Sequence, residues 1–343
     1  MKAGYVAPMS IAAVNGGLRT QAKLTVQHIR EFGVEPVLLS PWDDINRRNF
    51  DLIHVFGATI ENIGIVKQIK ALEIPIVLST VLFSNRSAGT IRTTLKIEKI
   101  LSPLVHGFKS EFNIKAEICS LADLNFPNTR DEAHLIEKGF SIPRNKISVI
   151  PNGVEEKFQN ADPKLFFKTY GIRDFILFAG QAGAERKNII KLLEAASGIE
   201  VPIVIIGSLN DDEYGNKCRI LAEKTNNVTF IEPLDHDSEM LSSAYAASKV
   251  FVLPSQYETP GIAAMEAALT GSNIVITERG GTKEYFGKHA YYINPNSTQS
   301  LLLELKKALA KENTDQLKEH ILSQFTWQKL AEQTANQYKK LLK

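Results

Sequence analysis

Short apolar runs alternate with longer segments whose apolar residues recur at helical spacing. In the first half, the runs typical of buried strands occupy residues 3–7, 36–39, 52–56 and 75–82. Residues 18–32 carry spaced apolar positions in a polar background, as a surface helix does, and Gly33 ends that segment. This alternation predicts a parallel sheet covered by helices on both faces.

The same pattern restarts near Phe175. Strands are expected at residues 175–179, 202–207, 228–231, 249–253 and 273–277, and helices at 188–196, 238–247, 261–269 and 298–310. Between the halves, residues 151–162 interrupt the periodicity with Pro-Asn-Gly and a charged stretch. The pattern therefore predicts an α/β chain of two Rossmann-like doubly wound domains, residues 1–155 and 156–326, facing across a cleft. Residues 327–343 form a final amphipathic helix.

Composition narrows the class of protein. The 343 residues include 40 basic and 38 acidic side chains, without the concentrated basic excess of a nucleic-acid-binding protein, so no nucleic-acid partner is expected. Cys119 and Cys218 lie too far apart for a zinc motif, and so few cysteines suit a reducing cytoplasm. No apolar run approaches the ~18–20 residues that span a bilayer, and the first residues are interpreted as a strand rather than a signal peptide. We expect a cytoplasmic protein.

The most informative segment is 254–267, which follows a buried strand and opens a helix. Gly261 allows a ligand to approach the backbone closely. The amides of Gly261 and Ile262 are expected to point outward at the start of the helix, where the helix dipole adds positive potential. The segment therefore predicts a phosphate-binding site.

Two carboxylates flank this helix start. Glu258 lies in the preceding loop and Glu266 inside the helix, with seven residues between them. Carboxylates accept hydrogen bonds from paired sugar hydroxyls, so we interpret one as a donor-sugar contact and the other as a ribose contact. Either glutamate alone would be a solvated helix charge, but the combination favours a binding site.

The order of these residues resembles the family 4 glycosyltransferases of GT-B fold, whose C-terminal domain carries a Glu, seven residues, Glu signature. The residues that match the signature are Pro254, Ser255, Glu258, Gly261 and Glu266. Pro260 stands where an aromatic residue is commoner. Other matches are residues 149–154 and 205–207, Gly271, Gly280-Gly281, Glu284, Asn128-Thr129 and Glu132. Residues 325–327 and the final helix, 327–343, resemble the segment of the family that crosses back to the N-terminal domain. The resemblance covers nearly the whole chain.

The resemblance implies a retaining transfer of sugar from a nucleotide-diphosphate sugar. It assigns acceptor binding to the first domain and donor binding to the second. Glu258 would orient the donor sugar, Glu266 would hold the ribose, and Lys187 with the amides of Gly261 and Ile262 would stabilise the departing diphosphate. No Asp-x-Asp cluster is placed to hold a metal ion, so neither a metal nor another cofactor is expected.

Two further segments complete the predicted donor site. In residues 180–188 the family usually places Arg after the first glycine and Lys six positions later. Lys187 matches, but Gln181 replaces the Arg, and Arg186 is the substitute we consider. In residues 15–17, Gly17 belongs to a loop resembling the one that reaches the diphosphate in the family.

Other functions stay open. Many relatives carry a histidine after the strand at 75–82, and this chain has none there. His54 is as consistent with a hydrogen-bonded strand residue as with a catalytic one, so we assign no general base. Gln181 and the missing histidine also suit a non-catalytic nucleotide-sugar-binding partner subunit. A nucleotide-sugar epimerase or a phosphorylase of the same fold is a further alternative, whereas Gly16-Gly17 lacks the third glycine of a dinucleotide fingerprint.

Residues 86–109 interleave basic with apolar positions. Such a segment is more often a solvated face over a core, but it also suits peripheral contact with an anionic membrane on its inner face. By analogy with the family, we expect the acceptor to be a saccharide or a lipid-linked molecule of cell-envelope or exopolysaccharide assembly.

Overall fold

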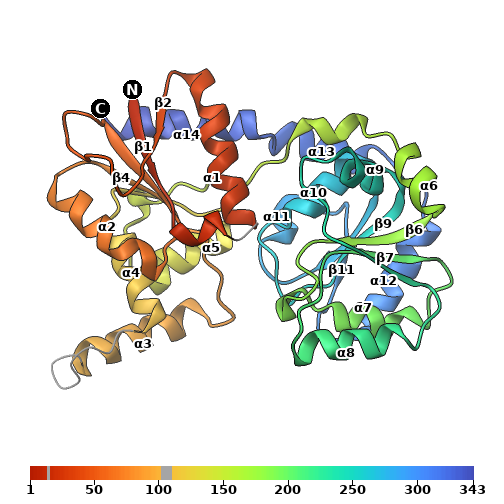
Figure 1. Ribbon diagram of the computed structural model, residues 1–343. Coiled ribbons are helices and arrows are strands. Elements are labelled where there is room, and N and C mark those ends of the chain that lie inside the picture. The colour runs from red at the N-terminus through yellow and green to blue at the C-terminus, as the bar shows by residue number, and fades with distance from the viewer. Residues whose placement is uncertain (14–15, 102–109) are drawn as a thin grey trace. The chain divides into compact units, whose positions relative to one another are not determined.

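A computed structural model describes residues 1–13, 16–101 and 110–343, which form two compact α/β units (Figure 1). The first unit comprises Met1–Gly153 and Trp327–Lys343, and the second comprises Val154–Thr326. The predicted limits at residues 155 and 326 lie at or beside these divisions. Asn15 of the glycine loop, and residues 102–109 of the predicted basic segment, lie outside the described residues.

The first unit is built on a five-stranded parallel sheet with strand order β2-β1-β3-β4-β5. Its strands are β1 (Lys2–Val6), β2 (Glu35–Leu38), β3 (Leu52–Phe56), β4 (Ile76–Ser79) and β5 (Leu124–Phe126). The strand order reverses beside β1, where ligands of doubly wound sheets usually bind. Gly17 is the first residue of α1 (Gly17–His28), the helix that follows β1.

Helices cover both faces of this sheet. Side chains of α1 and α14 (Trp327–Leu341) form one core with Tyr5 and Leu52 of the strands. Side chains of α2 (Ile60–Ala71) and α4 (Glu111–Leu121) form another core with Ile53 and Leu78. Neighbouring residues Leu52 and Ile53 thus face opposite helix layers, as alternation along a strand requires. The remaining helices are α3 (Ala88–Leu101) and α5 (Arg130–His134).

A buried polar cluster joins α14 to the sheet of the first unit. His54 on β3 is hydrogen-bonded through Nδ1 to the Tyr338 hydroxyl and through Nε2 to Ser79 Oγ at 2.9 Å. The Tyr5 hydroxyl lies 3.2 Å from that of Tyr338. Burial lowers the pKa of His54 to about 3, so the imidazole is neutral. The structure therefore favours the core-histidine interpretation of His54.

The second unit contains a six-stranded parallel sheet with order β11-β10-β9-β6-β7-β8. Its strands are β6 (Phe175–Ala179), β7 (Ile203–Ile206), β8 (Val228–Ile231), β9 (Ser248–Leu253), β10 (Asn273–Thr277) and β11 (Tyr291–Ile293). This order is that of the Rossmann fold, with its switch point between β6 and β9. The predicted pair of Rossmann-like doubly wound domains is confirmed.

The helices of the second unit surround this sheet and complete a single core. They are α6 (Lys164–Tyr170), α7 (Ile189–Ala196), α8 (Glu213–Ala222), α9 (Glu239–Ala247), α10 (Ile262–Leu269), α11 (Thr282–Phe286), α12 (Thr298–Ala310) and α13 (Gln316–Gln324). In the parts of both units that the structure describes, no helix combines the length and apolar character needed to cross a membrane.

Candidate functional site

The predicted donor-site residues of the second unit gather at the switch point of its sheet. Residues 180–188 follow β6, residues 254–262 follow β9, and these two strands are neighbours. Parallel strands present their carboxyl ends at one edge, so the two loops converge there. The structure thus brings together six of the predicted residues with Glu258 and Glu266, and leaves only Gly17 in the other unit.

Hydrogen bonds fix the two loops to each other. Asn188, whose backbone is left-handed with φ of 59°, donates from its side-chain amide to the carbonyl oxygens of Pro254 and Pro295, each at 2.9 Å. The amide of Gln256 donates to the carbonyl of Arg186 at 2.8 Å. Because Asn188 is buried, these bonds hold the side chains on either side of it in defined positions.

Lys187 and Glu258 form an ion pair at the centre of the site. The ammonium lies 2.5 Å from Glu258 Oε1, and the side chains are only 13% and 8% exposed. Ser255 Oγ donates to the same oxygen at 2.6 Å, and an Arg186 nitrogen lies 3.8 Å away. Burial alone would raise the pKa of Glu258, but Lys187, Ser255 and Arg186 together hold it below its usual value.

This pairing changes the predicted division of roles. The sequence assigned Lys187 to a ligand phosphate and Glu258 to a sugar, whereas the structure has each neutralising the other. The Lys187 ammonium therefore already has a protein anion, Glu258, beside it. Glu258 Oε2 makes no hydrogen bond to any residue that the structure describes, so this oxygen keeps its capacity to accept one.

The backbone of Glu258 is held against the loop that follows β10. The Glu258 amide donates to the Arg279 carbonyl at 3.1 Å, and the Gly281 amide donates to the Glu258 carbonyl at 3.0 Å. Gly280 has φ of +93°, and a Cβ atom there would lie 2.1 Å from the Glu258 carbonyl oxygen. Only glycine permits this close approach without moving the backbone.

Helix α10 begins beside the ion pair, as the sequence predicts. Pro260 is buried, and Gly261 is the N-cap residue in the left-handed region with φ of 84°. Within the described chain, the amides of Gly261 and Ile262 donate to no protein acceptor. Unsatisfied amides at a helix start form an environment that favours a phosphate group.

Glu266 lies inside α10 and is only 3% exposed. Its Oε2 accepts from the Tyr245 hydroxyl at 3.0 Å, and its Oε1 lies 2.7 Å from His236 Nε2. Glu266 is thus not a solvated helix residue. The sequence analysis missed His236, which stands between β8 and α9, and the available signal was only a histidine in a loop entering the same sheet edge.

A charged cluster surrounds the other side of His236. Its Nδ1 lies 3.3 Å from Asp237 and 3.7 Å from Glu155. These three residues have ligand-type atoms close enough to hold a metal ion. Lys157 already supplies a positive charge there, with its ammonium 2.6 Å from Asp237 and 3.1 Å from Glu155. The expectation that no metal is needed stays a prediction.

His236 should make folding stability depend on pH. Its hydrogen bond to Glu266 raises the pKa of His236 above 6.5 in the folded state, against an opposing effect of burial. The stabilisation is therefore complete below pH 6.5 and is lost as the pH rises through the folded-state pKa. Urea unfolding measured across this pH range should show a decline in the free energy of unfolding. The decline should be smaller in His236→Asn. The same substitution in a Glu266→Gln background should change the slope little, and an undiminished decline in His236→Asn would contradict this assignment.

The remaining predicted residues occupy more open positions. Gln181 is exposed in the loop after β6, and its carbonyl accepts from the Ala184 amide at 3.0 Å. The Arg186 side chain is 44% exposed. In the first unit, the segment where relatives carry a histidine is held by Glu132, which accepts from Thr80 Oγ1 at 2.5 Å and from the Leu82 amide at 2.6 Å.

Residues 165–322 match the model of the glycosyl transferases group 1 family. An uncharacterized glycosyltransferase of Methanocaldococcus jannaschii is 25% identical over 253 residues, covering 66% of this chain and 58% of that protein. A mannosylfructose-phosphate synthase of Agrobacterium fabrum is 22% identical over 254 residues, covering 66% and 56%. The match thus spans little more than half the length of these relatives.

Similar solved structures cover the chain almost completely. A sucrose-phosphate synthase from Thermosynechococcus elongatus superposes with a TM-score of 0.78 at 17% identity, covering 99% of each chain. HepE of Anabaena, solved with UDP-glucose, superposes with a TM-score of 0.73 at 14% identity, covering 99% of this chain and 100% of that one. At such identities the likeness establishes the fold. Residues 165–322 therefore match a glycosyltransferase group 1 domain, and the chain has the GT-B architecture of its structural neighbours.

Proposed function

We propose that this chain is a retaining family 4 glycosyltransferase that takes a sugar from a nucleoside-diphosphate sugar bound by its second unit. The observation that carries the proposal is the buried Lys187–Glu258 pair beside the unpaired amides of α10, at the switch point of a Rossmann sheet. The group 1 match supports the reaction class, and the UDP-glucose complex of HepE supports the type of donor.

In the proposed complex, the diphosphate lies against the amides of Gly261 and Ile262 and the ammonium of Lys187. These groups stabilise the negative charge that grows as the bond from the anomeric carbon to the phosphate oxygen breaks. Glu258 Oε2 accepts a hydrogen bond from a hydroxyl of the donor sugar. Arg186 and Gln181 complete the phosphate contacts from the β6 loop, and Pro260 closes the site under the helix start.

The Glu266 carboxylate accepts hydrogen bonds from the ribose hydroxyls. Both of its oxygens already accept one hydrogen bond, from Tyr245 and His236, but each carboxylate oxygen offers a second lone-pair direction. The two protein contacts then orient the carboxylate for the ribose. Gly17 belongs to the loop of the first unit that we propose to contact the diphosphate. We propose that the first unit also binds the acceptor.

The acceptor oxygen attacks the face of the sugar from which the diphosphate departs, and its proton passes to the departing phosphate oxygen. The new bond therefore keeps the donor's anomeric configuration. Proton NMR of the first product formed tests this step. A coupling constant of the anomeric proton that indicates the opposite anomeric configuration would exclude it. No metal or other cofactor takes part in this proposal, and removing divalent ions with a chelator should leave the rate unchanged.

Nucleotide binding provides the first test. A nucleoside diphosphate at about 100 times its dissociation constant should raise the free energy of unfolding by about 2.7 kcal/mol. Thermal unfolding with UDP, GDP, ADP and CMP should show this gain for one base, and Glu266→Ala should reduce it because the ribose contact is lost. Stabilisation by none of the four would favour a non-catalytic partner subunit, the alternative that Gln181 in place of arginine supports.

The acceptor we propose is a saccharide or a lipid-linked molecule of cell-envelope or exopolysaccharide assembly, reached from the cytoplasmic side of the membrane. Support comes from α3, where Arg92, Lys96 and Lys99 are exposed together with Ile97 and Ile100, which are 52% and 73% exposed. Basic and apolar side chains on one helix suit an anionic lipid surface. Sedimentation with anionic and with neutral vesicles tests this contact, and equal recovery with both would exclude it.

A further inference from the structure

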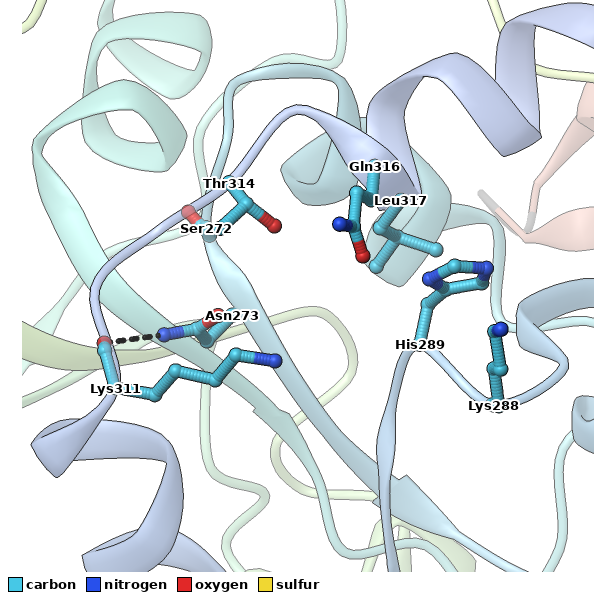
Figure 2. Close-up of a pocket in the computed structure, with 8 residues that line it drawn as sticks. All are labelled: Ser272, Asn273, Lys288, His289, Lys311, Thr314, Gln316 and Leu317. Atoms are coloured by element: carbon cyan, nitrogen blue, oxygen red, sulfur yellow. Dashed lines mark hydrogen bonds between the residues drawn. The ribbon is translucent and has the colours of Figure 1, made fainter.

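A polar pocket lies at the amino end of β10, whereas the candidate donor site lies at the carboxyl ends of the strands of the same sheet. It has a volume of about 240 Å³, and Figure 2 shows its lining residues. They are Ser272, Asn273, Lys288, His289, Lys311, Thr314, Gln316 and Leu317. Asn273 is the first residue of β10, so the pocket opens at the amino end of a strand whose carboxyl end leads to Gly280. The proposed function makes no use of it.

Two exposed ammonium groups, those of Lys288 and Lys311, line this pocket beside the imidazole of His289. Lys288 and Lys311 form no salt bridge with any residue that the structure describes, and no lining residue is acidic. Burial and the charges of His320, Lys288 and Lys311 lower the pKa of His289. Both effects disfavour the charged imidazolium, and only the second reflects the positive charges around the pocket. The pocket therefore attracts anions.

Neutral hydrogen-bonding groups accompany the cations. The Asn273 side-chain amide donates to the carbonyl oxygen of Ala308 at 3.0 Å and to that of Lys311 at 3.0 Å, and so fixes one wall. Figure 2 shows the second of these bonds. The side chains of Thr314 and Gln316 make no hydrogen bond within the described ranges. Figure 2 shows the Gln316 amide and the Lys311 side chain extending toward the same space. Hydroxyl and amide groups beside ammonium groups suit the several acceptor oxygens of a phosphate.

We propose that this pocket is a second, separate anion site that binds a small phosphate-bearing ligand, either inorganic phosphate or a compact phosphate ester. Its volume of about 240 Å³ is below the range of roughly 300–1,000 Å³ of sites for drug-sized ligands. A nucleotide sugar is therefore too large for it. The positive potential, the absence of acidic lining and the polar walls together select the phosphate over a neutral sugar.

His289 provides a direct readout. A bound phosphate favours the imidazolium, so saturating phosphate should raise the pKa of His289. NMR titration of the imidazole signals, assigned with His289→Gln, measures this pKa with phosphate and with chloride at equal ionic strength. Inorganic phosphate and a hexose phosphate are titrated in parallel, and tighter binding of one identifies which form of phosphate the pocket prefers. A shift that saturates with phosphate and not with chloride supports the site.

Matched variants locate the effect. Lys288→Gln and Lys311→Gln should each weaken phosphate binding about tenfold or more, because each removes a charged hydrogen-bond donor. Lys224→Gln removes an exposed charge of the same unit that is not part of the pocket, and should change nothing. Lys187→Gln, in the donor site, should also leave the titration of His289 unaltered. The same shift in chloride, or one that survives both pocket substitutions, would overturn the proposal.

Discussion

Replacing Lys187 with methionine is expected to reduce sugar transfer at least about 100-fold and to lower the free energy of unfolding by about 3–5 kcal/mol. The first effect follows from losing a cation at the departing diphosphate. The second follows because Glu258, with its side chain 8% exposed, would keep a buried charge without its main partner. Rates of transfer and urea unfolding of the same preparations measure the two effects.

The double variant Lys187→Met, Glu258→Gln separates them. It removes both charges, so most of the lost stability should return while transfer stays low. Lys191→Met is the matched control, since Lys191 pairs with Glu194 at 2.7 Å where the side chains are 28% and 34% exposed. Such surface pairs contribute about 0–1 kcal/mol. If the double variant recovered transfer along with stability, Lys187 would have only a structural role.

A second large effect is expected from Gly280→Ala. The left-handed backbone costs a non-glycine residue about 1–2 kcal/mol, and the clash of the new Cβ with the Glu258 carbonyl should add about 1–3 kcal/mol. The backbone must shift to relieve a separation of 2.1 Å, and Glu258 moves with it. We therefore expect transfer to fall together with stability, as measured by a transfer assay and urea unfolding.

Gly271→Ala is the control for this substitution. Gly271 has φ of +95°, almost that of Gly280, but nothing lies within 4 Å of a Cβ atom placed there. Its replacement should cost only the backbone strain and leave transfer nearly unchanged. Equal losses in the two variants would show that the contact with Glu258 is unimportant.

The hydrophobic pattern predicted most of the fold because the inner strands of both sheets, such as β3, β4, β6 and β7, are buried and mostly apolar runs. Residues 52–56 and 175–179 were predicted at the bounds that the structure shows. The strands β5 and β11 were missed, since each has three residues and lacks a run long enough to stand out. The helix expected at 18–32 continues as a 3₁₀ turn after His28, which periodicity alone does not distinguish.

The site was predicted in its residues and only partly in its contacts. Glycine and proline next to a strand end indicate the loop of α10 from local sequence. The pairing of Lys187 with Glu258 joins residues 71 positions apart in the chain, and that of His236 with Glu266 joins residues 30 apart. Such contacts depend on strand order, and one amphipathic pattern is compatible with several orders.

The first unit is built from two separate segments of the chain, and this has a consequence for synthesis on the ribosome. Its core includes Ala331, Ala335 and Tyr338 of α14, whereas the rest of that unit ends at Gly153. The second unit is continuous and is made entirely in between. At roughly 5–20 residues per second, α14 emerges on the order of 10–30 s after Gly153. During that interval the nascent first unit exposes the apolar face that α14 later covers, so the second unit can complete its fold first.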